Sequence, residues 1–413
     1  MSRTRIPSTS SFYIVMLGLL SALPPLATDI GLPAIPALQA GFHVGIGEAT
    51  HTLTVFLAGF SFGPILFGPL SDRYGRRPVL LGGLFLFTLA AFACAWANQI
   101  GGLLLVRFVQ GIAAGAAATL PAAIVRDVFS GHLALSRQSY VALVNAVAPL
   151  VAPLLGAAIL QLGDWRLIYE SLGVIGCALF LLAWLGYAET RPQASAERAC
   201  GPKVFGAALA AYKLVLRDRA YVIHAALLAA SFGTMFAYIT GSSAVFIDML
   251  GVSGTAYGGL FALTAAGTIA GAAAGGRLAR AFGACKPLAG GVIGSALINL
   301  VLLAAALLGT RSIPLVAACV VASNFCAGIV MPNATHQALE PVGQVAGSAA
   351  ALLRSMQMLA GAATGALVGM LTGNRLTAMA VVMSLSALAG LGLLYLRRVQ
   401  GRAGRGVQAG LAR

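Results

Sequence analysis

Two charged residues stand inside long apolar segments of the sequence. Asp29 lies near the end of the first segment, before the prolines at 33 and 36, and Arg107 lies about seven residues into the segment 100–123. Ionisable side chains within a bilayer are costly and usually mark ion or proton pathways. Burial disfavours the charged form of a carboxylate, so such a group suits proton exchange. We hypothesise that Arg107 alternately pairs with Asp29 and releases it as protons and substrate exchange. The alternative for Asp29 is an interfacial aspartate at a proline break.

A second group of charges forms a short loop, residues 68–78, with one acid among several bases. Dense charge at a helix end is costly unless it is paired or solvated, so the acid among these bases favours a specific role for the loop. The alternative is a basic anchor at the membrane surface. The loop residues that carry this prediction are Gly68, Asp72, Arg73, Gly75, Arg76 and Arg77.

The elements that must position these residues are membrane-spanning helices. The chain has 413 residues, of which 59% are hydrophobic and only 9% charged, with a mean hydropathy of +0.91. This composition excludes a water-soluble protein, and alternating strand patterns are absent. The fold class expected is all-α, with twelve transmembrane helices in two six-helix bundles. The spans expected are 12–33, 50–70, 78–97, 100–123, 138–162, 166–187, 221–247, 255–278, 287–308, 312–333, 344–372 and 376–396.

The basic residues indicate the topology. The net charge of +15 is spread over short connections instead of forming a basic domain, so nucleic acid is not expected as a partner. With both termini in the cytoplasm, Arg166, Arg311 and Arg375 are the basic residues on the outer side, as the positive-inside rule predicts. The domains expected are the first bundle at 1–187, a cytoplasmic linker at 188–219, the second bundle at 220–397 and a basic cytoplasmic tail at 398–413.

The two halves also show an internal repeat. At one constant offset, Gly59 matches Gly267, Gly63 matches Gly271 and Gly68 matches Gly276, so the loop at 68–78 has its counterpart at 276–287. The second loop is degenerate, because an arginine, residue 280, stands where the first has its aspartate. Parallel repeats of this kind are typical of transporters with two halves related about the membrane normal.

These motifs resemble known signatures. The loop resembles the G-x-L-x-D-R-x-G-R-R motif of the major facilitator superfamily, in which the aspartate and arginines form a charge cluster that latches one conformation of the transporter. The resemblance implies such a latch mainly in the first half of this chain, with Asp127 as the local partner of the loop. Asp29 with the following Leu-Pro-Ala-x-Pro resembles the bicyclomycin- and chloramphenicol-resistance (Bcr/CflA) branch of drug:proton antiporters, and Arg107-x-x-Gln-Gly resembles its proton-coupled members. An antiporter-type segment follows at Pro149, Pro153 and Gly156, although its usual second glycine is alanine here.

A substrate cavity is expected among apolar and aromatic side chains with few polar groups, which suits amphipathic ligands; each of them could instead face lipid. Arg354 departs from the branch pattern. We expect it at the cytoplasmic end, in water or with the charged loop, in preference to a substrate role, which an anionic substrate would require. The candidate cavity residues are Asn145, Phe232, Met235, Phe236, Tyr238, Met356 and Gln357.

No phosphate-binding loop or His-Glu-x-x-His motif occurs, so neither an enzyme nor a primary pump is expected. The resemblance implies a monomeric, multi-pass protein of the bacterial plasma membrane that exports small amphipathic drug-like molecules by alternating access. Its partners are the substrate, protons and lipid. It needs no cofactor, because the proton gradient supplies the energy. The alternatives are export of an endogenous metabolite, such as a sugar, nucleoside or amino-acid derivative, and uncoupled facilitation.

Overall fold

The computed structural model describes all residues except 1–5, 8–9, 191–203 and 412–413, and the described part is helical. The first half contains α1 (Ser11–Asp29), η1 (Leu32–Ala34), α2 (Ile35–Phe42), α3 (Ile46–Tyr74), α4 (Arg76–Ala95), α5 (Ile100–Val128), α6 (Gly131–Ile159) and α7 (Trp165–Gly186). The second half contains α9 (Val204–Arg217), α10 (Arg219–Ser243), the π-helical η2 (Ala244–Met249), α11 (Gly254–Phe282), α12 (Cys285–Leu307), α13 (Ile313–Leu339), η3 (Glu340–Val345), α14 (Ala346–Met370) and α15 (Arg375–Leu411).

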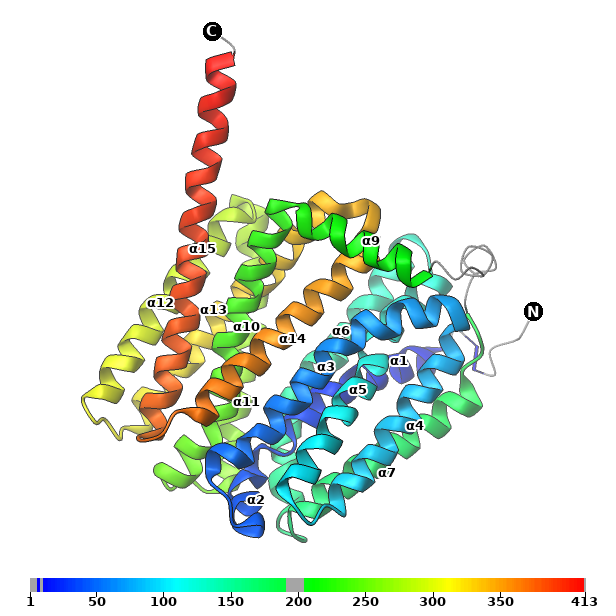
Figure 1. The fold of residues 1–413 in the computed structure, drawn as a ribbon, viewed down its shortest axis with the longest axis vertical. Helices are drawn as coiled ribbons and strands as arrows, with labels where there is room; N and C mark the ends of the chain where they lie inside the picture. Colours follow the sequence, from blue (N-terminus) through cyan, green and yellow to red (C-terminus); the bar gives the residue numbers. More distant parts are fainter. Residues whose placement is uncertain (1–5, 8–9, 191–203, 412–413) are drawn as a thin grey trace.

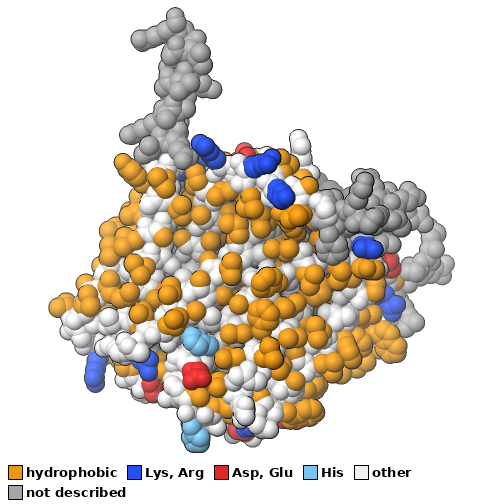
Figure 2. All heavy atoms as spheres, in the orientation of Figure 1, with side chains coloured by type: hydrophobic (Ala, Val, Ile, Leu, Met, Phe, Trp, Pro, Cys, Tyr) orange, Lys and Arg blue, Asp and Glu red, His pale blue; other side chains and the backbone are white. Residues whose placement is uncertain are grey.

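Twelve of these helices are membrane spans. Eleven continuous helical stretches of the described chain are long and apolar enough to cross a membrane, and one of them, Ile313–Met370, contains both α13 and α14. Figure 2 shows hydrophobic side chains over the body of the visible face, with charged side chains gathered toward its two ends. The predicted fold class is therefore confirmed.

The spans form two bundles of six (Figure 1). In the first bundle α3 packs on α5, α1 on α6, and α4 on α5 and α7; in the second, α10 packs on α14, α11 on α13, and α12 on α13 and α15. The main contacts between bundles are α3 with α14 and α6 with α11. These two contacts are equivalent under the internal repeat, because α3 corresponds to α11 and α6 to α14.

Glycines bring the equivalent helix pairs of each half close together. In the first bundle, a Cβ on Gly63 or Gly115 would overlap the backbone of the other glycine, so α3 and α5 touch directly. In the second bundle, Gly271 of α11 lies against the backbone of Phe325, and Gly328 of α13 lies against that of Thr268. Close helix contact at small residues is thus found in both halves.

The first span is broken where one helix was expected over 12–33. Helix α1 ends at Asp29, and the chain continues through η1 before α2 begins at Ile35. Proline lacks a backbone N–H and so cannot donate the next helical hydrogen bond, and Pro33 stands at the start of η1. The break ends α1 at its only carboxylate.

The connections at one end of the molecule differ from simple loops. The amphipathic helix α9 lies across the ends of both bundles in Figure 1. Residues 191–203 of the expected linker lie outside the described part of the chain. Helix α15 passes the expected boundary at residue 397 and continues to Leu411, projecting from the bundle. Because the number of described spans is even, the start of α1 and the end of α15 lie on the same side of the membrane.

Candidate functional site

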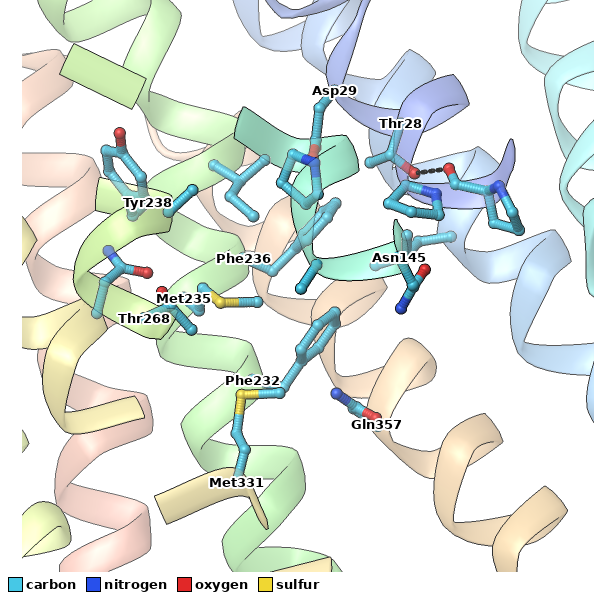
Figure 3. Close-up of a pocket in the computed structure, with 18 of the residues that line it drawn as sticks. Thr28, Asp29, Asn145, Phe232, Met235, Phe236, Tyr238, Thr268, Met331 and Gln357 are labelled. Atoms are coloured by element: carbon cyan, nitrogen blue, oxygen red, sulfur yellow. Dashed lines mark hydrogen bonds between the residues drawn. The ribbon is translucent and has the colours of Figure 1, made fainter. Parts of the chain in front are cut away.

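A cavity of about 340 Å³ lies between the two bundles. Its wall is mostly apolar, and α1, α3 and α6 line it from the first bundle while α10, α11, α13 and α14 line it from the second. Figure 3 shows side chains of both bundles that face this space. The lining residues with chemical interest are Thr28, Asp29, Asn145, Pro149, Phe232, Met235, Phe236, Tyr238, Thr264, Thr268, Asn324, Met331, Arg354, Gln357 and Met358.

Asp29 reaches this cavity from the last residue of α1. Its side chain is only 4% exposed, and Figure 3 shows it at one end of the group of lining side chains. The preceding turn is shaped by Pro24 and Pro25, and Thr28 donates its hydroxyl to the carbonyl oxygen of Pro24 at 2.9 Å. Among the described residues, no basic side chain forms an ion pair with the Asp29 carboxylate. A buried carboxylate therefore faces the cavity without a counter-ion.

Arg107 is buried beside the end of α1 but does not pair with Asp29 in this structure. Its Nη1 donates to Gln110 Oε1 at 2.7 Å, its Nη2 to the carbonyl of Ala27 at 3.3 Å, and its Nε to the carbonyl of Thr52 at 3.3 Å.

Aromatic rings complete the surroundings of this guanidinium, whose Cζ lies 4.3 Å from the ring centre of Phe56 and 5.5 Å from that of Tyr169. Such contacts stabilise a cation in an apolar site. Arg107 is thus held by backbone carbonyls, a side-chain amide and aromatic rings. Its contact with α1 is the carbonyl of Ala27, two residues before Asp29, the partner that the sequence suggested.

The antiporter-type segment of α6 packs against the break after α1. A Cβ on Gly156 would overlap the carbonyl oxygen of Ile30 and meet Pro33, so only glycine permits this approach. Pro149 lines the cavity, and Pro153 lies within the same helix. The segment therefore sets the distance between α6 and the Asp29 end of α1.

The predicted aromatic wall lies on α10. The rings of Phe232 and Phe236 stack with centres 5.9 Å apart, Met235 lies between them in sequence, and Tyr238 contacts Thr264 of α11 through its hydroxyl at 3.2 Å. Asn145 of α6 faces the same space. The sequence analysis did not predict the two threonines of α11 in the lining, Thr264 and Thr268. Their spacing of one helical turn within an apolar segment could have indicated that they share one face.

Helix α14 presents a different face from the one expected. Arg354, Gln357 and Met358 line the cavity, whereas Met356 does not and instead packs against the neighbouring core of the second bundle. Residues three and four apart share a helix face, while a residue two positions on points away from it. Arg354 thus lies in the cavity wall, and the expectation that it joins the charged loop is wrong.

The charged loop forms a cluster around Arg76, whose side chain is largely buried. Its Nη1 contacts Asp72 Oδ1 at 2.6 Å, and its Nε contacts Asp127 Oδ2 at 2.9 Å. Asp127 ends α5, so Arg76 joins three helices. Arg73 lies over the ring of Tyr74, and Gly68 has open space where a side chain would stand. The structure thus brings Asp127 to the loop, as the sequence suggested.

Glu189, just beyond α7, closes this cluster and was missed by the sequence analysis. Its carboxylate oxygens accept the backbone N–H groups of Arg76 at 2.9 Å and Arg77 at 3.1 Å. Gly75 adopts a φ of 101° at the turn, and a Cβ there would collide with the same carboxylate. A carboxylate at a helix N-terminus satisfies free N–H groups and opposes the positive end of the helix dipole. Nothing in the local sequence indicates this contact.

Two tyrosines lie beside the cluster. Burial raises the pKa of the Tyr187 hydroxyl above its usual range, and that hydroxyl lies 2.6 Å from Thr190 Oγ1. On α9, burial and then the nearby charge of Asp72 raise the pKa of Tyr212. Helix α9 therefore lies close to the charged loop. The degenerate loop of the second half, by contrast, has no ion pair from Arg277 or Arg280 within the described chain.

Among known sequences, the profile described as Major Facilitator Superfamily matches residues 17–366. The uncharacterized MFS-type transporter YdgK of Bacillus subtilis is 34% identical over 389 residues, which cover 91% of this chain and 92% of the relative. The bicyclomycin resistance protein homolog of Haemophilus influenzae is 29% identical over a stretch that covers 86% of this chain and 88% of the relative. The chloramphenicol resistance protein of Pseudomonas aeruginosa is 31% identical, covering 61% and 58%.

Solved transporter structures share the fold. A bacterial homolog of the human lysosomal transporter Spinster, in an inward-facing and unoccupied conformation, matches with a TM-score of 0.68 at 16% identity, covering 96% of each chain. A POT family transporter in complex with a thioalcohol-conjugated peptide matches with a TM-score of 0.73 at 13% identity, covering 95% and 98%. At these identities the likeness concerns the arrangement of the helices.

Proposed function

Because the chain belongs to the Major Facilitator Superfamily, and is thus a multi-pass transporter instead of an enzyme, we propose that it exports small amphipathic, drug-like molecules in exchange for protons. Two relatives named for bicyclomycin and chloramphenicol resistance support the substrate class. The mostly apolar cavity, with its stacked phenylalanines and methionines, supports it as well, because such surfaces accept varied apolar ligands.

The position of Asp29 is the observation that carries this proposal. A buried carboxylate without a counter-ion faces the cavity from α1. Burial favours its neutral form, and an entering cation or a strong hydrogen-bond donor favours its ionised form. Substrate and proton therefore compete for one group, which is the requirement for exchange of the two.

Arg107 supplies a way to release the substrate. Its Nη2 donates to the carbonyl of Ala27, two residues before Asp29. A shift of this side chain from its carbonyl partners toward Asp29 would pair the carboxylate and expel a bound cation. Because Gln110 on the same helix and Thr52 of α3 hold Arg107 on its other side, the exchange of partners connects proton binding to movement of α1 relative to α3 and α5.

We place the end that carries α9, the charged loop and both termini in the cytoplasm of a bacterial plasma membrane, as the positive-inside rule favours. In that orientation the bundles meet at the outer end, where Gly47 of α3 approaches the backbone of Gly369 on α14. The Arg76 cluster then acts as a conformational latch in the first bundle, since it joins the inner ends of α3, α4 and α5.

Drug susceptibility in a host without its own efflux pumps tests the proposal. Expression of the wild type should raise resistance to some amphipathic compounds in a chemically varied panel, and a protonophore should abolish the effect. Asp29→Asn should lose the resistance, whereas Asp248→Asn, at an exposed aspartate on η2, should keep it.

Purified protein gives the direct test of coupling. Binding of a transported compound should release protons from the wild type and not from Asp29→Asn. Full resistance with Asp29→Asn would refute the role of this carboxylate. No protection against any compound would instead favour export of an endogenous metabolite, and transport without proton release would favour uncoupled facilitation.

A further inference from the structure

Arg354 places a second charge in the cavity wall, opposite the first. The charged side chains in the lining are Asp29, on α1 of the first bundle, and Arg354, on α14 of the second. Arg354 forms no ion pair or hydrogen bond within the described part of the chain. Gln357, one turn further along α14, adds a buried amide to the same wall. A guanidinium in an apolar wall is costly without a counter-ion.

The two charges lie at different depths in the membrane. Arg107 bridges the end of α1 to the carbonyl of Thr52, so the end of α1 lies at the depth of that residue. Thr54, two residues on, meets Gly365 of α14. Arg354 precedes Gly365 by about eleven residues, which is roughly 16 Å of helix. The end of α1 and the position of Arg354 on α14 therefore lie at different depths of the cavity lining.

Figure 3 shows how Asp29 and Gln357 lie within the lining. Asp29 lies at the top of the view, and Gln357, one turn from Arg354 on α14, lies toward the bottom. The side chains of Phe232 and Met235 lie between these two levels. The space thus has an acidic end, an apolar aromatic middle and a basic end.

We propose that this cavity binds elongated zwitterions, with a cationic group at Asp29, an apolar centre against the aromatic wall and an anionic group at Arg354 and Gln357. This substrate class rests on the proposed exchange function. A simple cation leaves Arg354 without a counter-ion and is repelled by it. A simple anion satisfies Arg354 but does not compete with the proton on Asp29. A zwitterion satisfies both ends and connects the two bundles.

The spacing also excludes ordinary α-amino acids as good ligands. Their ammonium and carboxylate groups are attached to one carbon, so they reach only one of the two charges. A rigid molecule with its charges at opposite ends is required. Suitable probes share one body: 4'-(aminomethyl)biphenyl-4-carboxylate as the zwitterion, biphenyl-4-ylmethanamine as the cation, and biphenyl-4-carboxylate as the anion, with phenylalanine as the short zwitterion.

Calorimetric binding to the full-length protein in lipid nanodiscs tests the proposal. Hydrogen bonds to charged groups contribute enough to change affinity roughly 10- to 100-fold, so the biphenyl zwitterion should bind at least about tenfold more tightly than the cation, the anion or phenylalanine. Arg354→Gln should remove the advantage of the zwitterion over the cation while leaving the affinity for the cation unchanged or improved. Arg311→Gln, at an exposed arginine between α12 and α13, is the matched control and should preserve the ranking.

Several outcomes would overturn the proposal. In the wild type, these are equal affinities for the biphenyl zwitterion and the biphenyl cation, or equal affinities for phenylalanine and the biphenyl zwitterion. In Arg354→Gln, the outcome is an equal loss of affinity for the biphenyl zwitterion and for the biphenyl cation. Proton release upon binding of the cation is measured in parallel and tests the exchange function separately. If the cation releases protons but the zwitterion has no advantage, only the substrate class fails. If no probe releases protons, the exchange function fails.

Discussion

Glu189 gives the sharpest test of the latch, because it joins the end of α7 to the N-terminus of α4 through two backbone hydrogen bonds. Removing a side chain that caps a helix N-terminus costs about 0.5–2 kcal/mol, and a carboxylate at that end contributes about 0.3–1 kcal/mol through the helix dipole. Glu189→Ala should therefore lower the free energy of unfolding by about 2 kcal/mol. Glu189→Gln keeps a hydrogen-bond acceptor but not the charge, so the free energy of unfolding should fall by about half as much.

Thermal unfolding of the purified protein in detergent measures this effect, and for a chain of 413 residues a loss of that size corresponds to a fall in melting temperature of about 2 °C. Glu48→Ala is the matched control, since Glu48 also lies in the first turn of a helix, α3, but is exposed. The melting temperature of Glu48→Ala should fall by less than about 1 °C. Equal shifts for Glu189→Ala and Glu48→Ala would show that the long-range contact adds nothing to the helix dipole and that the cluster does not include α7.

Three further predictions concern the latch and the bundle contact. In detergent melting, Asp127→Asn should destabilise more than Asp72→Asn, because the Arg76–Asp127 pair is mostly buried whereas the side chain of Asp72 is 52% exposed; the reverse order would contradict this account. In transport assays, Asp72→Asn should slow turnover about tenfold or more while Arg280→Gln does not, and equal sensitivity would disprove the asymmetry between the loops. Gly47→Val should also slow transport, because its side chain would collide with Gly369, whereas Gly82→Val, with open space around it, should not; equal rates would mean that this contact is dispensable.

The sequence predicted those parts of the site that depend on short-range patterns. Apolar runs of sufficient length predict the spans because the bilayer requires them. The loop motif predicted a charge cluster, and Asp127 was a suitable partner because it ends a helix on the side assigned to the cytoplasm. The break after Asp29 follows from proline chemistry, although the sequence analysis did not place the end of α1 there.

Other contacts depend on distances and rotations that a single sequence does not contain. Glu189 is more than a hundred residues from Arg76 in the chain, and only the packing of α7 on α4 brings them together. The helix rotation of α14 determines that Met358, and not Met356, faces the cavity. The depth of Arg354 relative to Asp29 follows from how α3 crosses α14, which no local pattern encodes.

Helix α3 links the latch to the cavity. One end carries Asp72 and leads into the Arg76 cluster, and the other end carries Gly47 at the contact with α14. Between them, Gly63 fixes α3 to α5, which carries both Arg107 and Asp127. Because α3 and α5 touch backbone to backbone, we expect them to move as one unit. We expect a displacement of α14 that opens its contact with Gly47 to act on that unit as a whole, and α5 then to transmit it both to Arg107 beside Asp29 and to Asp127, the partner of Arg76.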